Sequence, residues 1–402
     1  MSLDTIRGDF PLFSQGYIYL DSASTALIPK PIAEKSLDYY LYYKANPLRS
    51  VHTLAQKIEE KIAWARSVCA KFINALPEEI IFVKNTTEGL NLIAKGLRIG
   101  KGGNIVVTAL EHHSNFVPWL VRCKRDHREF RIIFPKGEDG ILSPEDFSEK
   151  IDETTKIVAI SHITNVLGTI LPIKEITKIA HKNGAYVVLD AAQSAPHISL
   201  DVKELNVDFL ALSGHKICGP SGCGLLYIRK ELAEKIEPLN YGGGACRSVE
   251  ISKFKYMDPP YMFEAGTIPF CEILMMADAI EYIKKIGLKN ILDHEKKLLK
   301  VIHELLDNLN SLKIYGPSPE FKTSIFSFNL KGVNPMNLGM MLDSISKIEV
   351  RSGHMCAEIC TKKVLKEKDG VVRASTYFYN NEEDVQKFAE ALKKISSAFS
   401  RT

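Results

Sequence analysis

The sequence predicts an α/β fold with a mixed, mostly parallel sheet in a large domain and a smaller α/β domain at the C-terminus. From residue 80 to residue 228, short apolar runs alternate with helical patterns, which is typical of a parallel sheet. These runs are rich in Ile, Val and Leu without strict alternation, as expected for strands buried on both faces. The pattern changes after Lys230. We therefore expect a large domain at 18–285 and a small domain at 286–402 that includes the N-terminal segment 1–17.

Local patterns predict the individual elements. In the large domain we expect strands at 17–20, 80–83, 104–108, 131–134, 156–161, 186–189, 207–212 and 224–228, and helices at 31–43, 53–73, 86–97, 115–125 and 173–182. The Gly- and Pro-containing stretch 241–267 is predicted to be a connector. Beyond it, we expect a helical segment at 271–309 with a break near Gly287, strands at 324–330, 348–351 and 371–375, and a closing helix at 382–399.

Composition excludes several classes of function. The chain has 402 residues, of which 45% are hydrophobic and 25% charged, values typical of a globular protein. Its formal net charge of +4 comes without a dense Lys/Arg block, so we expect no nucleic-acid partner. No apolar run approaches about 18 residues and the N-terminus has no apolar signal region, so we expect a cytoplasmic protein that does not enter membranes. The eight cysteines are interpreted as reduced thiols.

A lysine and an acid follow two of the predicted strands. Lys216 ends the motif Ser213-Gly214-His215-Lys216 after the run 207–212, and Asp190 follows the run 186–189. Such positions favour pyridoxal phosphate, because the lysine amine forms a Schiff base with its aldehyde and a carboxylate keeps its pyridine nitrogen protonated. The alternatives are a surface lysine and a turn-capping aspartate. The Gly- and Pro-rich turn after Lys216 favours the functional interpretation.

Other polar residues follow neighbouring strands. Thr86 and Thr87 open a helix, where phosphate binds backbone N–H groups, although an ordinary N-cap is the alternative. Ser213 and His215 can reach the same phosphate. His112 can stack on the cofactor ring and handle protons, whereas surface or metal-ligating histidines are the alternatives. Asn165 can donate to the ring hydroxyl or the substrate, and we expect no metal site.

These motifs resemble the class V, fold type I family of pyridoxal-phosphate enzymes, and within it the cysteine desulfurases that serve iron–sulfur assembly. The resemblance runs nearly end to end. It rests on Tyr19-Leu20-Asp21, Thr86-Thr87-Glu88, Glu111-His112-His113, Pro118-Trp119, the stretch 161–168, the stretch 190–193, Ser213 to Lys216, the stretch 263–267, the stretch 351–356 and Arg373-Ala374-Ser375.

The resemblance implies a role for each matching residue. Lys216 is the Schiff-base lysine, Asp190 and Gln193 hold the pyridine nitrogen and ring hydroxyl, and His112 stacks on the ring. Phosphate ligands are then Thr86, Thr87, Ser213 and His215, with Thr267 reaching in from the second subunit of a homodimer. Arg373 matches the arginine that binds the substrate carboxylate, a role suited to guanidinium geometry, with Asn165 and Arg351 beside it.

Cys356 decides the expected reaction. It lies on a polar loop near Arg351 and His354, neighbours that favour the thiolate, and it matches the family's persulfide-forming nucleophile. The implied course is removal of the α-proton of L-cysteine by Lys216 and attack of Cys356 on the substrate sulfur, which leaves alanine and a persulfide for a sulfur acceptor or iron–sulfur scaffold. Selenocysteine is a further candidate substrate. The alternatives are a structural role for Cys356 and a resolving or metal-binding role for Cys360.

Four positions depart from the family pattern: Leu48, Cys246, Met355 and the segment 268–270. They leave the cofactor-binding motifs intact but concern the choice of substrate and of sulfur acceptor. Other class V activities, namely selenocysteine lyase, epimerase and aminotransferase, share the cofactor site and do not depend on Cys356. The alternative that is not an enzyme is a non-catalytic scaffold that keeps the fold. The presence of both Lys216 and Asp190 argues against it.

Overall fold

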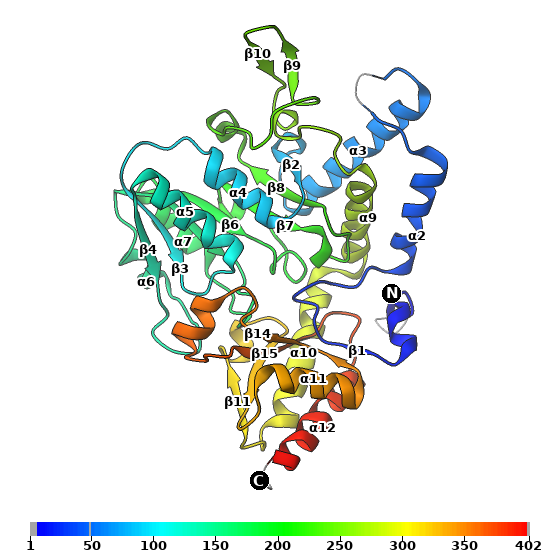
Figure 1. Cartoon of the computed structure of the whole chain (residues 1–402), viewed down its shortest axis with the longest axis vertical. Helices are drawn as coiled ribbons and strands as arrows, with labels where there is room; N and C mark the ends of the chain where they lie inside the picture. The colour runs from blue at the N-terminus through cyan, green and yellow to red at the C-terminus, as the bar shows by residue number, and fades with distance from the viewer. Residues whose placement is uncertain (1–5, 48–49, 400–402) are drawn as a thin grey trace.

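The computed structural model describes residues 6–47 and 50–399 and is built around a seven-stranded sheet (Figure 1). The strand order is β2-β8-β7-β6-β5-β3-β4. Strand β8 is antiparallel to both β2 and β7, whereas the remaining neighbours are parallel. The strands are β2 (Ile80–Val83), β3 (Asn104–Thr108), β4 (Glu129–Ile133), β5 (Thr155–Ser161), β6 (Tyr186–Asp190), β7 (Phe209–Ser213) and β8 (Gly224–Ile228). The predicted mostly parallel α/β architecture is therefore confirmed.

Both faces of this sheet are buried, which explains the unbroken apolar runs. Along β6, for example, Val187 and Leu189 enter one apolar core while Val188 enters the other. Helices α4 (Thr86–Gly96) and α5 (Val117–Asp126) contribute to the second core, and α3 (Thr53–Phe72), α7 (Ile173–Lys182) and α9 (Phe270–Ile286) contribute to the first. Two shorter helices, α6 (Pro144–Ser148) and α8 (Val202–Leu205), lie in connections between strands.

The C-terminal part forms a four-stranded antiparallel sheet of order β11-β12-β15-β14. Its strands are β11 (Leu312–Tyr315), β12 (Ile325–Leu330), β15 (Val371–Ser375) and β14 (Arg351–Gly353), accompanied by α10 (Leu288–Leu306), α11 (Pro335–Ser346) and α12 (Glu382–Phe399). Strand β1 (Ile18–Tyr19) pairs in parallel with β13 (Ile348–Glu349). Ile18 and Leu20 consequently join the apolar core of the C-terminal part. The predicted domain limits stay a prediction, and we propose that residues 18–20 belong with the small domain.

Several predicted elements need correction. The strand expected at 348–351 is two short strands, because β13 pairs with β1 while β14 pairs with β15. The connector 241–267 contains a hairpin of β9 (Cys246–Val249) and β10 (Phe254–Tyr256), whose mostly exposed side chains leave no burial pattern in the sequence. The helix expected at 31–43 is α2 (Lys30–Asp38) followed by a π-helical turn, Tyr39–Tyr43.

The break near Gly287 is confirmed: α9 ends at Ile286, and Gly287 has a φ of 89°. Across the described ranges, no helix combines the length and the apolar character that crossing a bilayer requires.

Candidate active site

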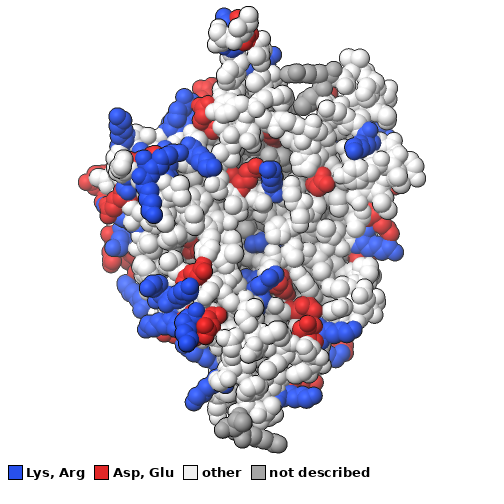
Figure 2. All heavy atoms as spheres, in the orientation of Figure 1, with Lys and Arg blue, Asp and Glu red and all other residues white. Residues whose placement is uncertain are grey.

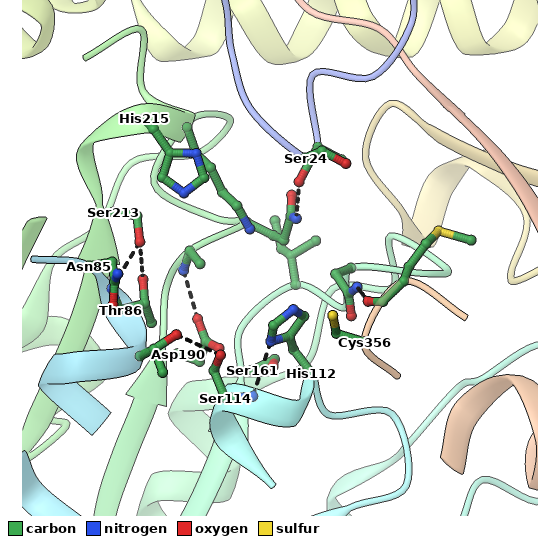
Figure 3. Close-up of a pocket in the computed structure, with 18 of the residues that line it drawn as sticks. Ser24, Asn85, Thr86, His112, Ser114, Ser161, Asp190, Ser213, His215 and Cys356 are labelled. Carbon is green, nitrogen blue, oxygen red and sulfur yellow. Dashed lines mark hydrogen bonds between the residues drawn. The ribbon is translucent and has the colours of Figure 1, made fainter. Parts of the chain in front are cut away.

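A cavity of about 440 Å³ opens at the carboxyl ends of β3, β5, β6 and β7. Ser161, Asp190 and Ser213, the last residues of three of these strands, line it, which is where open α/β sheets place their ligands. Almost all of the predicted site residues share this cavity: Thr86, Thr87, His112, Asn165, Asp190, Gln193, Ser213, His215, Lys216, Arg351, Cys356 and Arg373. Figure 3 shows Ser213 and Thr86 toward one end of it, Cys356 toward the other and His112 between them.

One end of the cavity is built on the start of α4. Asn85 caps this helix by accepting a hydrogen bond from Glu88 N at 3.0 Å. The Ser213 hydroxyl lies 2.7 Å from the Thr86 hydroxyl and accepts from Thr86 N at 2.9 Å, so the end of β7 is tied to the first turn of α4. The Thr87 hydroxyl lies 2.7 Å from that of Ser114. Hydroxyls and backbone donors at a helix N-terminus suit a phosphate.

Gly89 allows α4 to approach the sheet this closely. An added Cβ at this position would lie 3.2 Å from Cβ of Ala211 in β7. A larger side chain there would push the helix start away from Ser213, because packed interiors leave little free space.

The middle of the cavity holds the candidate ring-binding groups. Asp190 is buried, its Oδ1 accepts from Ala192 N at 2.9 Å, and burial raises its pKa. Burial lowers the pKa of Lys216 to about 8, partly offset by the charge of Asp190. Burial, together with the charge of Lys216, lowers the pKa of His112 to about 3 and that of His215 to about 4. Both histidines are therefore neutral at physiological pH.

The position of the proton on His112 follows from its contact with the backbone. Nδ1 of His112 accepts from Ser114 N at 3.1 Å, so the single proton of the neutral ring is on Nε2. A neutral ring with a fixed tautomer suits stacking on a flat cofactor more than acid catalysis.

A second group of residues surrounds the guanidinium of Arg373, which is almost fully buried. Its Nη1 donates to the carbonyl of Asn165 at 2.7 Å. Its Nη2 donates to the Ser24 hydroxyl at 2.7 Å and to Asp21 Oδ1 at 3.2 Å. Arg351 reaches the same pair, with Nη2 2.7 Å from Asp21 Oδ2 and Nε 3.0 Å from the Ser24 hydroxyl.

Cys356 is exposed on the loop between β14 and the turn at 360–364. Met355 and Cys356 both adopt left-handed backbone conformations, with φ of 50° and 54°, which is uncommon for residues other than glycine. Two contacts hold this loop. Asn165 Nδ2 donates to the Met355 carbonyl at 2.9 Å, and His113 N donates to the Cys356 carbonyl at 2.7 Å. The thiol is thereby kept at the cavity.

The polar neighbours expected to favour the Cys356 thiolate have other contacts. The Arg351 guanidinium binds Asp21 and Ser24, while Nδ1 of His354 lies 2.8 Å from the Thr361 hydroxyl. His354 does not line the cavity. We therefore base the role of Cys356 on its position rather than on these neighbours.

Several other predicted positions lie away from the cavity or outside the described residues. Thr267 is exposed and borders a separate surface pocket. Cys360 is buried and burial raises its thiol pKa to about 12, which argues against a resolving or metal-binding role. Cys246 is half-buried in β9, and Leu48 falls outside the described residues.

Sequence reasoning missed the roles of Asp21, Ser24 and Glu111. The polar stretch 21–25 follows a predicted strand, the same signal that identified Asp190, so Asp21 and Ser24 could have been found. The Glu111 carboxylate is buried and accepts from Thr108, Ser161 and Asn115 at 2.7, 2.6 and 2.8 Å. Burial raises the pKa of Glu111 to about 7. It joins the ends of β3 and β5 through Thr108 and Ser161.

Comparison with known proteins places this site in a family. The model of the family described as "Aminotransferase class-V" matches residues 18–388. The chain belongs to the class-V aminotransferase family. This class-V chain is 43% identical over 397 residues to a probable cysteine desulfurase of Pyrococcus abyssi, covering 98% of the chain and 97% of its relative. It is 38% identical to a probable cysteine desulfurase of Methanothermobacter thermautotrophicus, covering 98% of each.

A solved structure agrees with these relatives. The apo structure of a cysteine desulfurase from Thermococcus onnurineus NA1 superimposes on the class-V chain with a TM-score of 0.94 and 40% sequence identity, covering 98% of both chains.

Class-V enzymes depend on pyridoxal phosphate, and the residues of the cavity fit this cofactor. Gln193 Oε1 and Asn165 Oδ1 are buried without a hydrogen-bond partner, and such atoms normally have one. The cavity also combines an amine, a buried carboxylate and a hydroxyl-lined helix start, the groups that an aldehyde, a ring nitrogen and a phosphate require.

Proposed function

We propose that this class-V enzyme is a cysteine desulfurase, which converts L-cysteine to L-alanine and takes the sulfur onto Cys356 as a persulfide. The observation that carries the proposal is the position of Cys356. This exposed thiol lines the same cavity as Lys216 and Arg373. A class-V enzyme that does not act on sulfur has no need of a thiol at this position.

The cavity would hold pyridoxal phosphate along its length. Lys216 would bind the aldehyde carbon, Asp190 the pyridine nitrogen and Gln193 the ring hydroxyl, with His112 against the ring. The phosphate would lie at Thr86, Thr87, Ser213 and His215. When bound, the cofactor withdraws electrons from the α-carbon of the substrate.

The substrate would lie between Arg373 and Cys356. Arg373 binds its carboxylate, and Asn165 and Arg351 help to orient it. Lys216, whose lowered pKa favours the neutral amine, removes the α-proton. The Cys356 sulfur then attacks the substrate sulfur. An S–S bond forms, the Cβ–S bond breaks, and Cβ keeps the electron pair and takes up a proton. A proton also returns to the α-carbon, so that cysteine and one enzyme thiol yield alanine and one persulfide.

The decisive experiment replaces the nucleophile. In Cys356→Ala we expect alanine formation from L-cysteine to fall to background while the visible absorbance of bound cofactor is retained, because the cofactor ligands are untouched. Alanine is measured by chromatography and the persulfide by mass spectrometry of the protein. Cys123→Ala, which removes a buried thiol outside the cavity, is the control and should behave as wild type. Full alanine production by Cys356→Ala would overturn the proposal and favour another class-V activity, such as an epimerase or aminotransferase.

We further propose that the enzyme is a homodimer that passes its sulfur to an acceptor or iron–sulfur scaffold protein in the cytoplasm, and that selenocysteine is a second candidate substrate. Exposed apolar side chains support a dimer: Leu37, Tyr40, Leu41 and Tyr42 are 50–73% exposed. Monomeric proteins seldom expose so many large apolar side chains next to one another. In Figure 2 charged side chains gather along the left side of the view and are sparser at the upper right. Thr267 would then complete the partner subunit's phosphate site.

A further inference from the structure

The carboxylate of Asp21 binds both arginines of the proposed substrate-carboxylate site without itself lining the cavity. Its two oxygens contact two different guanidinium groups, Arg351 at 2.7 Å and Arg373 at 3.2 Å. The side chains of Asp21 and Arg373 are only 10% and 2% exposed, whereas that of Arg351 is 50% exposed.

Ser24 reinforces this arrangement. Its hydroxyl donates to Asp21 Oδ1 at 2.7 Å and accepts from Arg373 at 2.7 Å and Arg351 at 3.0 Å. The three charged groups are therefore held as one unit by direct hydrogen bonds, and all but Asp21 also line the cavity.

The charge of this unit has a consequence for substrate choice. Two guanidinium groups and one carboxylate leave a single positive charge, which one substrate carboxylate neutralises. Without Asp21, two positive charges would face the cavity and would bind a second carboxylate. Charge interactions at contact distance are strong in a partly buried site, so one charge changes affinity substantially.

We propose that Asp21 sets the charge of the substrate-carboxylate site and so restricts the enzyme to amino acids with a single carboxylate. This inference rests on the proposed function, in which Arg373 binds the substrate carboxylate. A purely structural role is the competing explanation, because Asp21 also forms a β-bridge with Ser375. The two explanations differ in one measurable respect: only the electrostatic role changes selectivity between anions.

The test uses Asp21→Asn in the holoenzyme, with succinate and butyrate as probes. These acids have four carbons each but carry two carboxylates and one. Their inhibition constants against L-cysteine and their effects on the Tm are both measured. We expect the preference for succinate over butyrate to rise by about tenfold or more. An unchanged preference, even with a lowered Tm, would overturn the inference.

Two controls make the result specific. Asp126→Asn removes a carboxylate that binds Arg122 and Arg125 outside the cavity, and it should leave the preference unchanged.

If Asp21→Asn does not fold, Arg351→Gln tests the same charge balance, because the charge of Asp21 then cancels that of Arg373. The preference for succinate over butyrate should fall by about tenfold in this variant, and an unchanged preference would overturn the inference. A wild-type enzyme that makes no alanine from cysteine would instead refute the proposed function.

Discussion

At the scale of single residues, burial controls the chemistry of the cavity. Burial lowers the pKa values of Lys216, His112 and His215 and raises that of Asp190, as expected when charged forms lose contact with water. For Lys216 the result is an amine that is partly neutral near physiological pH. Such an amine is a better nucleophile and base than an exposed lysine.

This lowered pKa predicts how cofactor loading depends on pH. The rate at which cofactor-free protein binds pyridoxal phosphate should rise with pH through about 8, the pKa of Lys216, because only the neutral amine attacks the aldehyde. Stopped-flow absorbance measures the rate. Asp190→Asn should move the midpoint to lower pH, because the carboxylate raises the pKa of Lys216. Lys95→Ala, which changes a lysine outside the cavity, is the control. A midpoint at the ordinary pKa of lysine would contradict the prediction.

At the scale of elements, the cavity depends on two local structures that hold functional groups in place. The start of α4 is pressed against β7 at Gly89 and Ala211. The Cys356 loop has two consecutive residues in the left-handed region, a conformation that costs free energy and persists only where other contacts hold it. Asn165 and His113 provide those contacts through the Met355 and Cys356 carbonyls.

The close approach at Gly89 predicts a packing defect with a functional effect. Gly89→Val should lower the free energy of unfolding by about 1–3 kcal/mol and should weaken binding of pyridoxal phosphate, because the added side chain separates α4 from β7. Urea unfolding and cofactor titration measure the two effects. Gly100→Val is the matched control, since an added Cβ there meets no atom within 4 Å. Unchanged cofactor affinity in a folded Gly89→Val protein would show that the helix start does not position the phosphate ligands.

At the scale of the whole molecule, the cavity is assembled from distant parts of the chain. Asp190 comes from β6 and Lys216 from the turn after β7, Ser24 from the segment after β1, and Arg373 and Cys356 from the C-terminal part. Any relative movement of the two sheets would change the separation between the cofactor-binding groups and the thiol.

The exposed apolar residues of the π-helical turn that follows α2 predict the assembly. Leu41 and Tyr42 are 68% and 73% exposed, so the double substitution to Asp should convert a dimer into monomers by placing charge in an apolar interface. Light scattering coupled to size-exclusion chromatography measures the mass. Met336→Asp with Met340→Asp changes exposed apolar side chains of α11, which lies among the C-terminal elements in the lower part of Figure 1, and should leave the dimer intact. A wild-type monomer, or a dimer that tolerates the substitution of Leu41 and Tyr42, would contradict the proposal.

Most of the large sheet could be predicted because each strand is buried on both faces and therefore reads as an apolar run. Elements whose side chains are mostly exposed could not be predicted in this way. The hairpin of β9 and β10 has no apolar period. The stretch 348–353 forms two strands instead of one, because its halves pair with different strands. Asp190, Ser213 and Lys216 were found because polar groups follow apolar strands, whereas Gln193, Arg373 and the role of Cys356 came from the family resemblance. His354 was assigned to the thiol by proximity in sequence alone, and the structure directs its ring to Thr361.

By itself, the sequence determined the α/β class and the set of polar residues at the ends of its strands, because hydrophobic periodicity and strand ends are local properties. Together with the family resemblance, it also predicted the roles that we propose for Lys216 and Cys356. Only the tertiary structure decided which groups touch. It placed Asp21 between Arg351 and Arg373, buried Cys360 and set the His354 ring against Thr361. Contacts between residues hundreds of positions apart depend on how the two sheets pack rather than on any local pattern.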